Sequence, residues 1–299
     1  MKDRRILSVT GGSTKFIQLV AGMIKLEEKG YNFTDIICKS ASGIAVLPFV
    51  FGLHEELVQE GLNVEFEKIF TSTPVTRTGG IHFKGIIRAV LSFLFPNITA
   101  FGKQDTKHLI RKYITKDMYR KYLTGDYPNI HVVTVDNTQG IPVIFNLKNI
   151  FCYEEALSII AGSSKITPMV EYEPFEGLCL VDGGMILAGG AGYIMETNYI
   201  KSERVESVVS LYSWTNPFPD CSEDWKKNVF SNTKRSSELL KAGGKYYGPR
   251  HEYWYCKANG IPLEQLFVPD VLDQLYDIDD KDLENAYNQT LEYLDKKLK

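Results

Sequence analysis

Two strand-to-helix units within the first fifty residues constrain the fold of this chain most. Ile6–Val9 is a short apolar run that ends at a pair of glycines, and a helical pattern of apolar residues follows it. Thr34–Cys38 repeats the pattern and leads through a small-residue turn into Ile44–Leu53. Because successive units of this kind pack as a parallel sheet, we expect an α/β fold with a central, mostly parallel sheet and helices on both faces.

Later segments extend this picture to a domain organisation. His131–Asp136 and Pro142–Leu147 flank a short polar turn and predict a β-hairpin. Val205–Tyr212 is the last clear strand, and polar helical patterns follow it. We therefore expect one domain at residues 1–215 and a C-terminal helical extension at residues 216–299 that packs on the same domain.

Composition excludes several classes of protein. Lys and Arg number 34 against 37 Asp and Glu, so the formal charge is -3, and a nucleic-acid partner is not expected. The five cysteines form no CxxC pair and no Cys/His cluster, which argues against a disulfide framework and against a metal site. The first residues lack the apolar region of a signal peptide. We expect a cytoplasmic protein without a cofactor.

The most apolar stretch, at residues 86–101, contains Arg88, Pro96 and Asn97. It is shorter than the ~20 apolar residues that a membrane-spanning helix needs. Our main interpretation is a buried helix. The alternative is an apolar lid or a membrane-facing element that borders the cleft of a lipid site.

Three turns carry residues suited to catalysis. Gly11-Gly12 opens a helix, where free backbone N–H groups can hold an anion. Lys39-Ser-Ala-Ser-Gly43 joins a strand to a helix, which is the setting of a nucleophile elbow. Asp182 ends a short strand and precedes two glycines, at the strand edge where α/β sheets place ligands.

Taken together, these motifs resemble the patatin-like phospholipase family. The matching segments are GGSTKF at 11–16, KSASG at 39–43, AGSSKITP at 161–168 and DGG at 182–184, and they cover about residues 6–212. The resemblance implies a lipid acyl hydrolase, a phospholipase or esterase, that works with a Ser–Asp dyad and needs no metal. It leaves the C-terminal part of the chain unexplained.

The resemblance also assigns roles to individual residues. It puts Ala41 at the position of the nucleophile, makes Asp182 the general base, and assigns the oxyanion hole to the backbone at Gly11, Gly12 and Ser13. Further residues are expected beside the substrate: Lys15, Ser42, Gly43 and Gly183.

Since Ala41 has no nucleophile, we expect this chain to be inactive as written. We favour an engineered Ser→Ala change, because Asp182 and the glycine turn are retained. The alternatives are a natural pseudoenzyme, acting as a lipid-binding, scaffolding or assembly protein, and a nucleophile displaced to Ser40 or Ser42.

A histidine-based hydrolase is the competing enzyme hypothesis, because His251 would complete the chain order Ser, Asp, His. Pro168 and the glycine-rich residues 188–193 are expected to shape the substrate cleft. The expected partner is a lipid or phospholipid substrate, with transient contact to a membrane surface, and homo-oligomer formation is left open.

Overall fold

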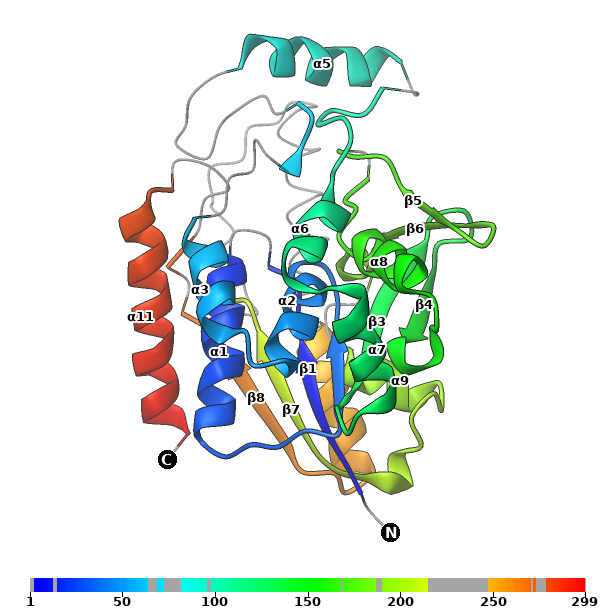
Figure 1. The fold of residues 1–299 in the computed structure, drawn as a ribbon. Coiled ribbons are helices and arrows are strands. Elements are labelled where there is room, and N and C mark those ends of the chain that lie inside the picture. The colour runs from blue at the N-terminus through cyan, green and yellow to red at the C-terminus, as the bar shows by residue number, and fades with distance from the viewer. Residues whose placement is uncertain are drawn as a thin grey trace, which may run out of the picture.

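The computed structural model describes residues 3–12, 15–63, 69–72, 82–95, 98–167, 169–186, 190–214, 247–269, 271–272 and 278–298. An eight-stranded sheet runs through the molecule in the order β5-β6-β3-β2-β1-β7-β8, and β4 pairs with β3 (Figure 1). The strands are β1 (Arg4–Val9), β2 (Asp35–Cys38), β3 (Asn129–Asp136), β4 (Ile141–Asn146), β5 (Glu173–Phe175), β6 (Leu178–Asp182), β7 (Val205–Tyr212) and β8 (Leu263–Phe267).

Five neighbouring strands, β3-β2-β1-β7-β8, are parallel to one another. β4 and β6 run antiparallel to β3, and β5 runs antiparallel to β6. The expected α/β fold with a mostly parallel sheet is therefore confirmed, and so is the predicted hairpin, which is β3 and β4.

Side chains of each strand alternate between the two faces of the sheet. Leu7, Val9, Ile36 and Cys38 belong to the larger core cluster, on the first face. Helices that cover this face are α1 (Phe16–Glu28), α2 (Ala41–Val50), α3 (His54–Leu62), α6 (Thr106–Tyr113), α7 (Lys116–Thr124), α8 (Tyr153–Gly162) and α11 (Asp280–Lys297).

The alternate side chains, including Ile6, Ile37 and Val133, form a second core cluster on the opposite face. They pack against α9 (Ala191–Glu196) and against a helix at residues 247–258, which contributes Cys256. Helices therefore cover both faces, as expected. Short 3-10 turns at η2 (Leu147–Asn149) and η4 (Ser202–Arg204) precede α8 and β7.

The C-terminal part of the chain is not only helical. β8 pairs in parallel with β7, so residues 263–267 belong to the central sheet. The local sequence does not predict this strand, because LEQLF alternates only weakly and is flanked by polar helical patterns. The expectation of a purely helical extension at 216–299 is thus wrong in this detail, although α11 does pack on α1 and α3 through Ile17, Leu283 and Ala286.

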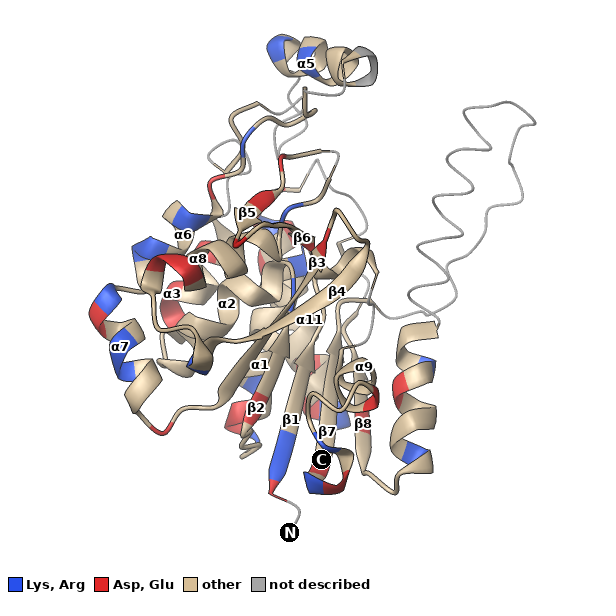
Figure 2. Cartoon of the chain, turned by 90° about the vertical axis from the view of Figure 1, so that its right-hand side faces the viewer, with Lys and Arg blue, Asp and Glu red and all other residues tan. Residues whose placement is uncertain are grey.

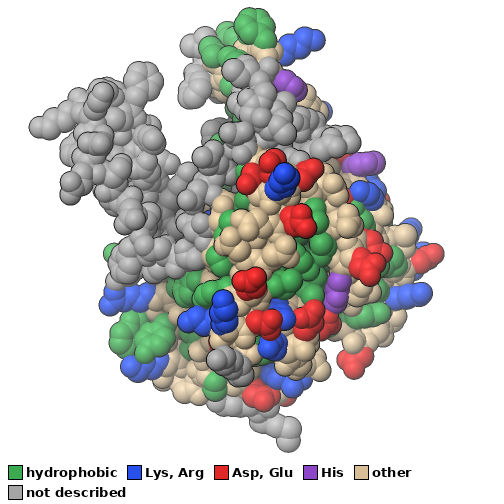
Figure 3. All heavy atoms as spheres, turned by 90° about the vertical axis from the view of Figure 1, so that its left-hand side faces the viewer, with side chains coloured by type: hydrophobic (Ala, Val, Ile, Leu, Met, Phe, Trp, Pro, Cys, Tyr) green, Lys and Arg blue, Asp and Glu red, His purple; other side chains and the backbone are tan. Residues whose placement is uncertain are grey.

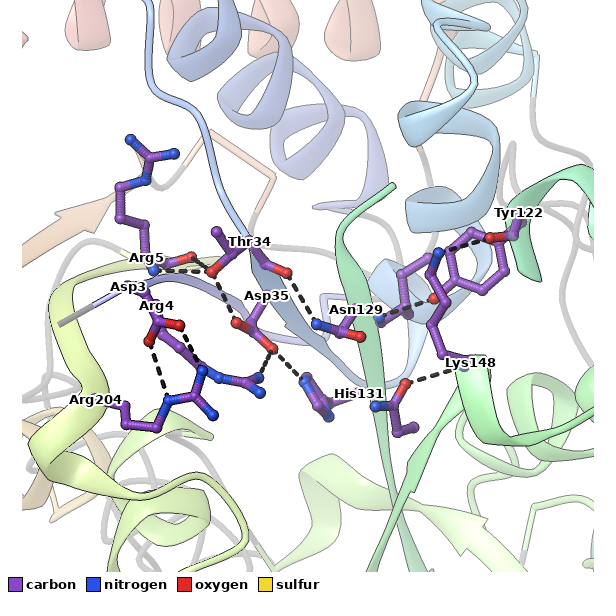
Figure 4. Close-up of polar contacts among 12 residues, drawn as sticks. Asp3, Arg4, Arg5, Thr34, Asp35, Tyr122, Asn129, His131, Lys148 and Arg204 are labelled. Carbon is purple, nitrogen blue, oxygen red and sulfur yellow. Dashed lines mark hydrogen bonds and ion pairs between the residues drawn. The ribbon is translucent and has the colours of Figure 1, made fainter. Parts of the chain in front are cut away.

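A polar cluster holds the amino-terminal end of the parallel strands together (Figure 4). The buried Asp35 carboxylate accepts a hydrogen bond from Arg4 at 2.6 Å and lies 2.9 Å from Nε2 of His131. Thr34 donates to the same carboxylate. Burial raises the pKa of Asp35, but the bonds from His131 and Thr34 and the nearby charges outweigh it and leave the pKa below its ordinary value.

The apolar stretch at 86–101 does not form a buried helix. α5 (Phe83–Leu94) lies at the end of the molecule to which the parallel strands run, separate from the other helices (Figures 1 and 2). Ile86, Ile87 and Val90 of this helix are exposed. Our main interpretation of the segment is therefore wrong, and the alternatives remain. Among the described helices, none has the length and apolar character required to cross a membrane.

Candidate active site

The turn between β2 and α2 holds one residue in an uncommon backbone conformation. Ser40 has φ 56° and ψ -133°, a region that L residues rarely occupy. Its N–H donates to the Ser163 carbonyl at 2.8 Å, and its own carbonyl accepts from Gly43. Strand and helix thus meet at Ser40, in the manner of a nucleophile elbow.

Ala41 does not occupy the apex of this turn. It is the first residue of α2, and the positive φ belongs to Ser40. The motif resemblance puts residue 41 at the centre of the elbow, but β2 ends at Cys38 and the positive φ lies at Ser40, one residue earlier than expected. The backbone geometry therefore favours Ser40 over Ala41 as the apex of the turn.

The register of β3 explains how Asp182 comes near this turn. β4 pairs with residues 131–136 of β3 and so occupies one edge of that strand. β2 and β6 share the other edge: Cys38 lies opposite Val132, and Asp182 lies opposite Thr134. The two strands run toward each other and end two β3 residues apart. Asp182 therefore reaches the carboxyl end of β2 from an antiparallel strand, which the sequence did not predict.

Residues 163–165 accept backbone hydrogen bonds from both Ser40 and Asp182. The Ser163 carbonyl accepts the N–H of Ser40, and the Lys165 carbonyl accepts the N–H of Asp182 at 2.9 Å. Both carbonyls follow the C-terminus of α8, in the AGSSK stretch that resembles the patatin-like family. This stretch thus fixes the relative position of Ser40 and Asp182.

The Ser40 hydroxyl donates a hydrogen bond to the Asp182 carboxylate. Both side chains are buried, and Asp182 also accepts the Gly184 N–H at 2.7 Å, at the start of η3 (Gly183–Met185). Burial raises the pKa of Asp182, whereas Ser40, the Gly184 N–H and the charge of Lys39 oppose that rise. A carboxylate with a raised pKa beside a hydroxyl is suited to act as a general base.

Ser42 is fully buried within the turn. Its Oγ accepts the Lys39 N–H at 3.0 Å and lies within hydrogen-bond distance of the Lys39 and Val9 carbonyls. Gly43 is just as confined, because a Cβ there would lie 2.8 Å from Oγ of Ser163. Both residues support the shape of the turn, and their expected contact with substrate stays a prediction.

The glycine turn after β1 lies against Ser40. A Cβ on Gly11 would be 2.5 Å from Cβ of Ser40, so only glycine permits this approach. The Gly11 carbonyl accepts from the Ser213 hydroxyl, and the Gly12 carbonyl accepts from the Lys15 N–H. Within the described ranges, the N–H groups of Gly11 and Gly12 donate no hydrogen bond, as oxyanion donors require.

The other expected site residues are placed as follows. Ser13 and Pro168 lie outside the described residues, as do residues 187–189, so their roles stay predictions. Gly183 packs against β3, where a Cβ would meet the Val133 carbonyl at 2.3 Å, so a larger residue does not fit there, and its expected contact with substrate stays a prediction. Lys15 precedes α1, and its expected contact with substrate also stays a prediction.

Lys39 is a buried cation beside the candidate nucleophile. Ile37 lies on the second face of the sheet and Cys38 on the first. Because successive side chains alternate between the faces, Lys39 is directed to the second face. Its pKa is lowered to about 8 by burial, while the charges of Glu252 and Asp182 oppose this effect. Glu252 is itself fully buried and accepts hydrogen bonds from Ala191 N–H, Ser210 and Tyr212.

His251 takes no part in this arrangement. Its Nε2 lies 3.1 Å from the Glu196 carboxylate, and the ring packs at Gly192 of α9. No contact joins it to Ser40 or Asp182 in the part of the chain that the structure describes. The histidine-based hypothesis therefore lacks its geometry.

One signal in the sequence could have identified Ser40. Centred on residue 40, the elbow reads Cys38-Lys-Ser-Ala-Ser42, with small residues at both glycine positions and a serine at the centre. With this alignment the central residue is a serine, so the motif contains its nucleophile. No sequence pattern identified Glu252, whose partners come from α9 and β7.

No family model matches the sequence, and no curated protein matches it at a significant level. Solved structures with similar folds include VipD from Legionella pneumophila, with a TM-score of 0.47 at 11% identity, where the match covers 98% of this chain and 67% of VipD. Another is the heterodimeric complex ExoU-SpcU from the type III secretion system of Pseudomonas aeruginosa, with a TM-score of 0.35 at 13% identity, covering 98% of this chain and 59% of the other. The chain thus spans about two thirds of the first structure and less of the second.

Proposed function

We propose that this chain is a serine esterase that acts on lipid esters through a Ser40–Asp182 dyad. The observation that carries the proposal is the hydrogen bond from Ser40, held in a rare backbone conformation, to the buried Asp182 carboxylate. The nucleophile is then present, so neither an engineered change nor a natural loss of the serine needs to be assumed. The chain is active as written.

The dyad supports a two-step acyl transfer. Asp182 takes the proton of Ser40 while Oγ attacks the ester carbonyl, and the N–H groups of Gly11 and Gly12 stabilise the oxyanion. When the carbon–oxygen bond breaks, the alcohol leaves with the proton from Asp182. Water then gives a proton to Asp182 while its oxygen attacks the acyl-serine. When the bond to Oγ of Ser40 breaks, the proton on Asp182 returns to Oγ and the carboxylic acid is released.

A lipid substrate is supported by the motif resemblance and by apolar side chains near the site. Met185 and Ile186 follow the Asp182-Gly-Gly turn and are exposed, as is Ile166 one residue after Lys165. An acyl chain can contact such side chains, whereas a polar ester gains nothing from them.

Active-site labelling tests the proposal directly. A fluorophosphonate forms a covalent bond only with an activated serine, and mass spectrometry of the digested protein identifies the modified residue. We expect the label on Ser40, with none on Ser40→Ala, and hydrolysis of p-nitrophenyl butyrate by the unmodified chain. An unlabelled and inactive chain that still binds lipid would instead support the pseudoenzyme hypothesis.

A further inference from the structure

α5 carries its apolar side chains on the outside of the molecule. Phe83 is 75% exposed, Ile87 is 45% exposed and Val90 is 55% exposed, and Ile86 lies on the same side. These positions follow the i, i+3, i+4, i+7 spacing that forms one stripe along a helix. A surface helix normally packs such a stripe against the protein core, whereas α5 exposes it to solvent.

The inner face of α5 is small and polar, and it is fixed to the protein. Gly85 is buried, and Nε of Arg88 donates to the Thr99 carbonyl at 2.8 Å. A Cβ on Gly102 would lie 3.4 Å from the same nitrogen, so Arg88 is held against the loop that follows the helix. Because these contacts hold the polar face inward, the apolar stripe faces solvent.

This stripe lies at the end of the molecule that holds Ser40. The loop after α5 joins the active-site segment: the Phe101 N–H donates to the Met169 carbonyl at 2.7 Å, and Val170 donates to Ile166. Lys165, next in that segment, holds Asp182. In Figure 3 the top of the molecule, where Figure 1 places α5, shows apolar side chains beside basic and histidine side chains.

The charges around the stripe indicate which surface it fits. Residues 82–95 include His82, Lys84 and Arg88 but no Asp or Glu, and Lys84 is exposed. A helix with an exposed Phe, Ile and Val stripe and only basic charges has the composition of an interfacial helix. Its twelve residues span about 18 Å, enough to lie in the headgroup plane.

We propose that α5 docks this protein on an anionic lipid surface, with the apolar stripe inserted among the headgroups and the Ser40 end of the sheet facing the membrane. Lys84 lies at the headgroup level, where it attracts acidic lipids. The inference stands on the surface of α5 and does not require ester hydrolysis.

Co-sedimentation with vesicles tests this docking. One set contains phosphatidylcholine alone, and the other adds about one third phosphatidylglycerol as the anionic lipid. We expect the full chain to bind the anionic vesicles, and Phe83→Ser/Ile87→Ser/Val90→Ser to bind at least about tenfold more weakly. Lys84→Glu should reduce the preference for anionic over neutral vesicles.

Phe151→Ser is the matched control. Phe151 is 82% exposed, but it follows β4 and η2 and so lies near the amino end of β3, away from Ser40. This variant should bind vesicles like the unmodified chain. Hydrolysis of soluble p-nitrophenyl butyrate by the triple variant should also be unchanged, which separates a failure of docking from a failure of the proposed esterase.

Three outcomes would overturn the inference. The first is that the triple variant binds vesicles as well as the unmodified chain. The second is that the unmodified chain binds neither set and remains monomeric in analytical ultracentrifugation. The third is that it binds neither set but self-associates in analytical ultracentrifugation, and that the triple substitution abolishes this association, because the stripe would then be an interface between two copies.

Discussion

The buried Lys39 ammonium interacts electrostatically with the buried Glu252 carboxylate, one residue before the strained Ser40. Glu252 belongs to the helix at 247–258, which covers the second face of the sheet. The pair therefore links a late segment of the chain to the turn that presents the candidate nucleophile, and Lys39 also acts on the charge of Asp182.

Ser40 and Ala41 should differ sharply in their effect on esterase activity. We expect Ser40→Ala to reduce kcat by at least about 10³-fold, because the nucleophile is lost. Ala41→Gly should retain most activity, since residue 41 contributes no reacting atom. The measurement is hydrolysis of p-nitrophenyl butyrate, with thermal unfolding of each variant as the control for folding. If residue 41 were the nucleophile position instead, Ser40→Ala would have no effect on activity.

The pH dependence of the reaction should report the raised pKa of Asp182. The general base must be ionised, so kcat/KM should rise with pH through an apparent pKa above the ordinary aspartate value of 3.8. Asp182→Asn should abolish activity at every pH. An apparent pKa at or below 3.8 would mean that another group controls the reaction.

The raised pKa of Asp182 also has a consequence for stability. Because this pKa is higher in the folded chain than in the unfolded chain, the stabilising contribution of the neutral carboxyl is complete below pH 3.8 and is lost as pH rises through the folded pKa. The asparagine stays neutral at every pH. The free energy of unfolding of Asp182→Asn, relative to that of the unmodified chain, should therefore be larger at about pH 7 than at about pH 3. Urea unfolding at both pH values measures this difference.

Breaking the Lys39–Glu252 pair should be costly. Glu252→Leu removes a charge that favours the buried Lys39 ammonium and also the acceptor of the Ala191 N–H, Ser210 and Tyr212, and we expect a loss of about 3–5 kcal/mol in the free energy of unfolding. Lys39→Met combined with Glu252→Leu should lose less than the two single variants together, since no buried charge of the pair is left unpaired. Additive losses in urea unfolding would show that the two side chains do not interact.

Lys39→Met has a second readout. The positive charge of Lys39 lowers the pKa of Asp182, so its removal should move the acidic limb of the pH–rate profile to higher pH. On that limb, moving the profile by about one pH unit reduces activity about tenfold at a fixed pH. Lys39→Arg, which keeps the charge, is the matched comparison and should move the limb less, whereas a merely structural role for Lys39 would leave its position unchanged.

Gly11→Ala should reduce activity with little effect on the rest of the fold. The added Cβ would meet Cβ of Ser40 at 2.5 Å and so displace either the nucleophile or the candidate oxyanion donors. Loss of one such donor typically reduces kcat about 10²–10³-fold. Full activity in this variant would show that the turn can move away from Ser40 without consequence for catalysis.

The sequence by itself determined the elements that depend on local pattern. Apolar runs that end at turns of small or polar residues predicted β1, β2 and the hairpin, because strand and helix periodicities are set by near neighbours. The same patterns placed Asp182 and Gly11 at turns, where polar and flexible residues can serve a site. They did not determine the position of residues 86–101, whose apolar content favoured a buried helix.

Only the tertiary structure decided which residue is the apex of the elbow. A side chain's direction at a turn depends on where the strand ends, and β2 ends where it does because of its pairing with residues 129–132 of β3, about ninety residues later. The bonds from Ser163 and Lys165 then fix Ser40 and Asp182 together. The outward stripe of α5 and the Lys39–Glu252 pair have the same origin, since each depends on partners distant in the chain, and local periodicity carries no information about which distant surface a side chain will meet.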